Sequence, residues 1–110
     1  MPVTTAPAGG HVDGEVALVR LRGRLDATTV AEARALLHGC VDGAPHEIVV
    51  DLAEVEMLDA AGLAMIVATH ELCQQRGHRL VLVEVPPRLC RLLSATRLTR
   101  VLSVRPQAAA

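Results

Sequence analysis

A chain of 110 residues is long enough for one domain and too short for two. It contains no Phe, Tyr or Trp, its basic residues are all arginine, and its formal net charge is -1. Aromatic stacking platforms and a basic face, on which nucleic-acid binding depends, are therefore absent, and we expect no nucleic-acid partner.

The cysteines and the N-terminal segment indicate a cytoplasmic protein. Cys40, Cys73 and Cys90 are odd in number and form no C-x-x-C pair, which argues against a disulfide framework or a zinc site. Residues 1–10 lack the charged and apolar regions of a signal peptide, and the apolar runs are too short to span a bilayer. We expect a cytoplasmic location and no membrane insertion.

The first third of the chain predicts a tail, a hairpin and a helix. Residues 1–10, rich in Pro and Gly, are interpreted as a flexible tail, and 11–12 as a short strand before the turn at 13–14. Alternation over residues 17–22 predicts a second strand. Thr29 and Glu32 then fit a capping box. The apolar stripe of the helix that follows is Val30, Ala33, Leu37, Cys40 and Val41, and the helix is expected to end at Asp42-Gly43.

Helices and apolar strands alternate through the rest of the chain. Continuous apolar runs over 48–52 and 80–83 are typical of strands covered on both faces. Gly77 is a plausible C-cap for the helix between them, and Pro87 can open another helix. The expected elements are a strand at 48–52, a helix at 60–76 with Leu63, Ile66, Val67 and Cys73 facing inward, a strand at 80–83, a helix from 87, a strand at 101–104 and a tail at 106–110.

This order predicts an α/β fold in one domain over residues 11–105. Strands that alternate with helices imply right-handed crossovers and a mainly parallel sheet. We expect a single sheet of four or five strands with helices packed against it. The first hairpin would supply an antiparallel N-terminal edge.

Residues with catalytic potential are present, but they form no recognisable catalytic pattern. The chain has no glycine-rich phosphate loop and no nucleophile elbow, so we expect neither an enzyme nor a cofactor. His46 and His78 each precede a predicted strand. A two-histidine metal site is conceivable there, but exposed loop histidines are favoured. His70 is interpreted as a hydrogen-bonded, partly buried side chain.

Three carboxylates surround the predicted end of the third strand. Asp51, Glu54 and Asp59 could supply a carboxylate pair for acid–base chemistry or ligand binding. The favoured alternative is that Asp59 caps the helix that follows it.

The segment from Asp51 to Leu63 resembles the signature of the STAS domain family. In that family a strand ending in D-L leads through a short loop to D-S-S-G-L or D-S-T-G-L at a helix start, and here the second motif reads D-A-A-G-L. Further matches lie in the same order along residues 12–105. They are Gly23-Arg24-Leu25-Asp26, Arg76-Gly77-His78, Pro87-Arg88-Leu89 with Leu92-Leu93, and Thr96-Arg97-Leu98.

The resemblance implies an anti-sigma-factor antagonist. Such a protein binds an anti-sigma factor of histidine-kinase-type ATPase fold, frees a sigma factor, and is released when the first Ser of D-S-S-G is phosphorylated. Here that position is Ala60 and its neighbour is Ala61, so neither carries a hydroxyl. The chain is then one of two things. It is an antagonist that can always bind its partner, or it is a structural subunit of a lipid-transport ATPase or of a stressosome-type complex. Its oligomeric state stays open.

Two segments that follow the carboxyl ends of predicted strands are expected to lie close together on one exposed edge and to form the docking surface. Its expected residues are Asp26, Asp59, Ala60, Ala61, Gly62 and Leu63, with Gly62 allowing a partner to approach the backbone closely. Arg97 stands where the family usually has glycine. Either this arginine is strained at positive φ, or the loop has changed shape.

Overall fold

Strands and helices alternate along the described chain. The computed structural model describes residues 3–5, 16–43 and 46–108. No helix in these ranges is long and apolar enough to cross a bilayer. The elements are β1 (Val3–Thr5), β2 (Val16–Leu25), α1 (Val30–Asp42), β3 (Glu47–Leu58), α2 (Ala60–Gln75), β4 (Arg79–Val85), α3 (Pro87–Ala95), the short 3₁₀ helix η1 (Leu98–Arg100) and β5 (Ser103–Pro106).

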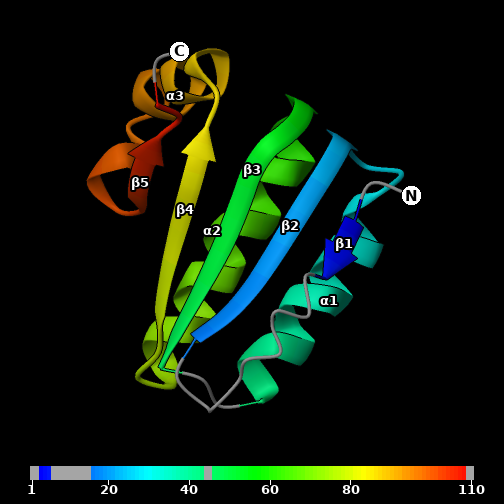
Figure 1. Cartoon of the computed structure of the whole chain (residues 1–110), viewed down its shortest axis with the longest axis vertical. Helices are drawn as coiled ribbons and strands as arrows, with labels where there is room; N and C mark the ends of the chain where they lie inside the picture. The colour runs from blue at the N-terminus through cyan, green and yellow to red at the C-terminus, as the bar shows by residue number, and fades with distance from the viewer. Residues whose placement is uncertain (1–2, 6–15, 44–45, 109–110) are drawn as a thin grey trace.

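The five strands form one sheet in the order β1-β2-β3-β4-β5. β2 to β5 are parallel, and β1 runs antiparallel to β2. Because the strand order follows the chain and β-α-β crossovers are right-handed, all the crossover helices fall on the same face of the sheet. Figure 1 shows α1 and α2 behind it. The predicted α/β fold, with a mostly parallel sheet and an antiparallel edge, is confirmed.

Among the described elements, helices cover one face of the sheet, and the expectation that both apolar runs are covered on two faces holds only in part. On the face without helices Val81 is 0% exposed. Val49 and Val83 point away from the helices and are half-buried. The helix-side core contains the fully buried side chains Val19, Leu21, Leu25, Leu37, Ile48, Val50, Leu52, Met65, Ile66, Leu82 and Leu93.

The uncovered face carries ion pairs between neighbouring strands. Because β2 alternates, its Arg20 and Arg22 point to this face and meet carboxylates on β3, as Arg79 of β4 does. An exposed pair such as Arg22–Glu54 contributes between about 0 and 1 kcal/mol, so it keeps the face hydrated more than it stabilises the fold, whereas Asp51 is buried beside its arginine. The pairs are Arg20–Asp51 at 3.5 Å, Arg22–Glu54 at 2.9 Å and Arg79–Glu47 at 3.7 Å.

Both ends of the ordered sheet differ from the prediction. Val3–Thr5 pair with β2, so these three residues belong to the sheet and not to a tail. The strand expected at 11–12 lies outside the described residues. At the other end Pro106 belongs to β5, and the N–H of Gln107 donates to the carbonyl of Val85 at 2.9 Å. The predicted C-terminal tail therefore begins later than residue 106.

The predicted capping box at the start of α1 is wrong. The Thr29 hydroxyl donates to the carbonyl of Arg24 at 2.7 Å and caps no helix N–H. The carbonyl of Asp26 accepts from the N–H groups of Thr29 and Val30, at 3.0 and 2.9 Å. A tight turn, and not a side-chain cap, therefore starts this helix.

Two other helix boundaries follow their sequence signals. Gly77 has φ +74°, and its N–H donates to the carbonyl of Gln74 while that of His78 reaches Cys73 at 2.8 Å. This is a Schellman motif, which requires the left-handed conformation that glycine adopts freely. Pro87 occupies the first position of α3, as predicted.

His70 lies on the inner side of α2 but is not hydrogen-bonded as expected. It is 8% exposed, and among the described residues neither ring nitrogen has a hydrogen-bond partner.

The loop after α3 keeps a left-handed backbone at Arg97, with φ 63° and ψ 16°. The loop has therefore not changed shape to suit the arginine. A side chain with a Cβ is destabilised in this region by about 1–2 kcal/mol, because the Cβ approaches the following carbonyl oxygen.

We predict that Arg97→Gly raises the free energy of unfolding by about 1 kcal/mol, because it removes this strain. The matched control is Arg91→Gly, which places the same change at an exposed position of α3. There glycine lowers stability by about 1 kcal/mol, because it is a poor helix former. Urea denaturation measures the change in the free energy of unfolding for each variant. A change of the same sign in both variants would contradict the strain assigned to Arg97.

Candidate functional site

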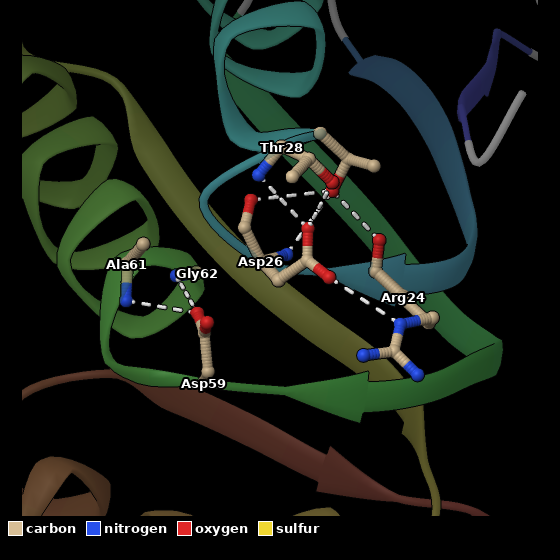
Figure 2. Close-up of polar contacts among 7 residues, drawn as sticks. Arg24, Asp26, Thr28, Asp59, Ala61 and Gly62 are labelled. Atoms are coloured by element: carbon tan, nitrogen blue, oxygen red, sulfur yellow. Dashed lines mark hydrogen bonds and ion pairs between the residues drawn. The ribbon is translucent and has the colours of Figure 1, made fainter.

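The carboxyl end of β2 and the start of α2 are held together by one backbone hydrogen bond. The register pairs Leu25 with Leu58, and the N–H of Asp59 donates to the carbonyl of Leu25 at 3.2 Å. Asp26 and Asp59 therefore begin two neighbouring loops, and Figure 2 shows their side chains on the same edge of the sheet. The structure thus brings the two aspartates of the predicted docking surface together.

Two shifts in the register between β2 and β3 allow Asp59 to reach the end of β2. Between the paired ends, β3 spans two more residues than β2, because the register shifts between Arg20 and Arg22 and again between Gly23 and Arg24. The Asp51 carboxylate accepts the N–H of Ala53 at 2.8 Å beside the first shift, and Gly23 has φ +74° at the second. These bulges bend β3 and set where it ends.

The long β3 also separates two carboxylates that were expected near each other. The strand does not stop at Leu52 but continues to Leu58, so Asp51 lies in mid-strand. Seven strand positions place it on the order of 20 Å from the end of β3. Asp51 pairs with Arg20 on the open face, and the predicted acid–base corner of Asp51 and Asp59 is wrong.

Asp59 is the N-cap of α2, as the favoured interpretation predicted. Its backbone is extended, and its Oδ1 accepts the N–H of Ala61 at 2.9 Å and of Gly62 at 3.1 Å, as Figure 2 shows. The carboxylate satisfies two of the free donors at the helix start and complements the helix dipole.

The first turn of α2 has an outer and an inner side. Ala60 is exposed and Ala61 is half-buried, whereas Leu63 packs partly against the core. Gly62 is buried, and a Cβ placed on it would lie 2.6 Å from the carbonyl oxygen of Leu25. The expectation that Gly62 opens the backbone to a partner is therefore wrong, because this glycine allows α2 to approach β2.

The loop after β2 is organised by the Asp26 carboxylate. Its Oδ1 accepts the N–H of Thr28 at 2.9 Å and the hydroxyl of Thr28 at 2.6 Å, and its Oδ2 lies 3.3 Å from Nε of Arg24 (Figure 2). The hydroxyl and then the N–H of Thr28, with a smaller effect of Arg24, hold the pKa of Asp26 below its ordinary value. Asp26 therefore maintains its own loop, besides any contact with a partner.

Arg24, Thr28 and Thr29 were not among the predicted site residues. The threonine hydroxyls tie the loop to Asp26 and to the carbonyl of Arg24. The sequence signal was available, since an aspartate followed by two threonines favours side-chain-to-backbone turns.

The histidines expected near each other are adjacent only through the backbone. The N–H of Arg79, next to His78, donates to the carbonyl of His46 at 2.9 Å. Within the ranges that the structure describes, no group of three or more metal-ligating side chains comes together.

Sequence comparison identifies the family. The model of the STAS domain matches residues 11–109, and the chain belongs to this family. Among curated proteins it is 31% identical over 86 residues to an anti-sigma-B factor antagonist of Staphylococcus epidermidis, covering 78% of this chain and 80% of the relative.

Solved structures share the fold. An anti-sigma factor antagonist from Mycobacterium paratuberculosis superimposes with a TM-score of 0.80 at 25% identity, covering 94% of this chain and 84% of that one. The phosphorylated form of the Bacillus cell fate determinant SpoIIAA superimposes with a TM-score of 0.69 at 18% identity, covering 93% and 89%. The Staphylococcus relative and the Mycobacterium protein are thus both named as anti-sigma factor antagonists.

We predict that Gly62→Ala lowers the free energy of unfolding by about 1–3 kcal/mol, because backbone and side-chain atoms of β2 and β3 must shift to admit the methyl group. Gly39→Ala is the matched control. A Cβ at Gly39, in the interior of α1, meets nothing within 4 Å. Alanine there raises stability by about 1 kcal/mol. Thermal and urea unfolding compare the two, and a tolerated Gly62→Ala would contradict the close approach.

The lowered pKa of Asp26 makes part of the stability pH-dependent. Because the folded-state pKa lies below the ordinary value of 3.8, ionised Asp26 stabilises the fold fully above that value. This contribution is lost as the pH falls through the lower, folded-state pKa. Urea titrations between pH 5 and about pH 2 should therefore show a smaller loss of stability in Asp26→Asn than in the wild type. If the stability of the wild type and of Asp26→Asn falls equally with pH, the fold does not lower the pKa of Asp26.

Proposed function

We propose that this protein is an anti-sigma-factor antagonist that binds its partner constitutively. The docking surface consists of Asp26, Asp59, Ala60, Ala61 and the exposed part of the loop between β2 and α1. The partner is an anti-sigma factor of histidine-kinase-type ATPase fold, which would release its sigma factor on binding, in the cytoplasm and without catalysis by this chain. The antagonist names of the similar proteins support this proposal.

The observation that carries the proposal is the environment of Ala60. It is the exposed first residue of α2, directly after the capping Asp59 and beside the Asp26 loop. The family resemblance assigns this position to the phosphorylated serine. Alanine has no hydroxyl to accept a phosphate, so a kinase has no acceptor at this position.

The charges around Ala60 explain why a phosphate would act on a complex. Asp59 already occupies the N–H groups of Ala61 and Gly62, so these donors are not free to neutralise a second anion. A phosphoserine would add about two negative charges next to that carboxylate. In water these charges are solvated, whereas under a bound partner they repel Asp59 and lose hydration. Phosphorylation would thus oppose docking and leave the fold intact.

Ala60→Glu should therefore fold normally and bind the anti-sigma factor at least tenfold more weakly. The matched control is Ala68→Glu, which introduces the same charge at another exposed alanine of α2, about 12 Å further along the helix. Anti-sigma factors from the source genome are purified and titrated by calorimetry against wild type and both variants. Equal affinities for wild type and Ala60→Glu would refute the docking surface.

Ala60→Ser should restore the switch. With the bound kinase and ATP, this variant should gain one phosphate by intact-mass measurement and then dissociate, whereas the wild type should stay unmodified and bound. Thr28, Thr29 and Ser94 are the alternative acceptors to examine in the wild type. If one of them is phosphorylated and the partner leaves, the switch has moved and constitutive binding is wrong.

A further inference from the structure

The last part of the chain carries a positive charge that the total charge conceals. No Asp or Glu follows Glu84, so residues 85–110 have a net charge of +5 and residues 1–84 have a net charge of -6. The five arginines of this part are all exposed, and they are Arg88, Arg91, Arg97, Arg100 and Arg105. The expectation that the balanced charge leaves no basic face is therefore wrong for α3, η1 and β5.

These arginines lack the carboxylate partners that most arginines of the chain have. Before residue 84, every described arginine except Arg34 is in an ion pair. After it, none of the five is paired with a carboxylate among the described residues. Arg88 donates instead to the carbonyl of Glu56 at 2.7 Å, where β3 and β4 diverge (Figure 1). Guanidinium groups without a counter-charge attract an external anion.

Two of these arginines and one apolar side chain are presented by the same turn. Leu98 packs partly against the core and Leu102 is 4% exposed, so the two leucines fix η1 to the domain. Arg97 directly before η1 and Arg100 at its end are exposed. Val101 follows them and, at 53%, is the most exposed large apolar side chain of the described chain. We call Arg97, Arg100 and Val101 the basic turn.

Arg97 is present at a cost to the stability of the fold. Its φ of 63° lies in the left-handed region, at the position where the family pattern has glycine. Its exposed guanidinium has no carboxylate partner in the described chain that could offset this strain. Strained residues of this kind concentrate at functional sites. A ligand outside the chain therefore explains this arginine better than the fold does.

The basic turn lies away from the proposed docking surface. η1 packs against α3 and β5, and β5 is the edge strand opposite β1. In Figure 1 the orange turn between α3 and β5 lies on the outer side of β5. The docking surface lies at the end of β2 and the start of α2, and β4 separates β3 from β5. A ligand can therefore occupy the basic turn while the docking surface is also occupied.

We propose that the basic turn binds an anionic lipid surface. Arg97 and Arg100 pair with lipid phosphates, and Val101 enters the headgroup region. Arg91 on α3 and Arg105 on β5 add attraction from the two flanking elements. Interfacial binding of this kind combines buried apolar area with the attraction of basic side chains to acidic lipids. The inference goes beyond the proposed function and does not depend on it.

The apolar member of the basic turn favours a bilayer over other polyanions. An exposed valine beside two arginines is buried in the interfacial region of a bilayer, whereas against the phosphates of a nucleic acid it gains little. The chain also has no aromatic side chain on which unpaired bases could stack. A bilayer presents its phosphates in a plane, so arginines on three successive elements need no single cleft to reach them.

Vesicle sedimentation tests the proposal with the full chain. Phosphatidylcholine vesicles that contain about one third phosphatidylglycerol should sediment the wild type at low ionic strength, and pure phosphatidylcholine vesicles should not. Raising the salt from about 0.1 to about 0.5 M should remove most of this binding, because salt screens exposed charges. Absence of binding to the anionic vesicles, or equal binding to both kinds, would overturn the proposal.

Single substitutions locate the site. Arg100→Gln should weaken binding to the anionic vesicles about fivefold. The matched control is Arg34→Gln, which removes an exposed, unpaired arginine from α1 and should bind as the wild type does. Arg97→Gly should also bind about fivefold more weakly although its fold is more stable, so its loss of binding cannot come from unfolding. Equal losses in Arg34→Gln and Arg100→Gln would refute the site.

Val101→Ser distinguishes a bilayer from other polyanions. Without the apolar side chain, vesicle binding should weaken at least threefold, because less apolar area is buried. A DNA duplex and polyglutamate are titrated in parallel, and the wild type should bind both more weakly than the anionic vesicles. Tighter binding of either polymer, or wild-type vesicle binding by Val101→Ser, would overturn the lipid assignment. Ala60→Glu should bind vesicles as the wild type does, which keeps this test independent of the docking surface.

Discussion

The geometry of the candidate site depends on the close approach of α2 to the end of β2. Gly62 lies so near the carbonyl of Leu25 that no side chain fits between them, and the N–H of Asp59 donates to the same carbonyl. This contact fixes where the helix begins relative to the neighbouring loop. The two extra residues of β3 are needed for the same reason, since without them the strand would not deliver Asp59 to that carbonyl.

Much of the fold could be predicted from the sequence because its signals are local. Gly77 and Pro87 act within one turn of their own helices, and the alternation of strands and helices leaves few sheet topologies open. The length of β3 was missed because the family pattern suggested a loop after Leu52, although Val55 and Leu58 continue an apolar face. The predicted capping box does not form because the hydroxyl of Thr29 donates to a carbonyl outside the helix. The geometry of the turn decides which partner this hydroxyl takes, and the spacing of residues in the sequence does not show it.

The position of the site was predictable, but its internal contacts were not. Asp26 and Asp59 follow parallel strands, whose carboxyl ends share one edge of the sheet. The role of Gly62 was misassigned because an approach between two segments of the same chain leaves no mark in the local sequence. Asp51 was misplaced because its carboxylate accepts a backbone N–H at a bulge within the strand, and not at the end of the strand. Arg88 carried a family match, yet its contact with Glu56 depends on how far β3 and β4 diverge.

The strictly sequential strand order has a consequence for how the chain folds. Every strand that the structure describes pairs only with the strands directly before or after it in the sequence, so none of these strands needs a partner from a distant segment. Each parallel pair closes a loop built around one α-helix, with η1 in addition between β4 and β5, and the entropy of closing loops of such similar length is nearly the same for each. The sheet can therefore grow by one strand and one helix at a time, and no intermediate needs to hold a place open in its centre for a later strand.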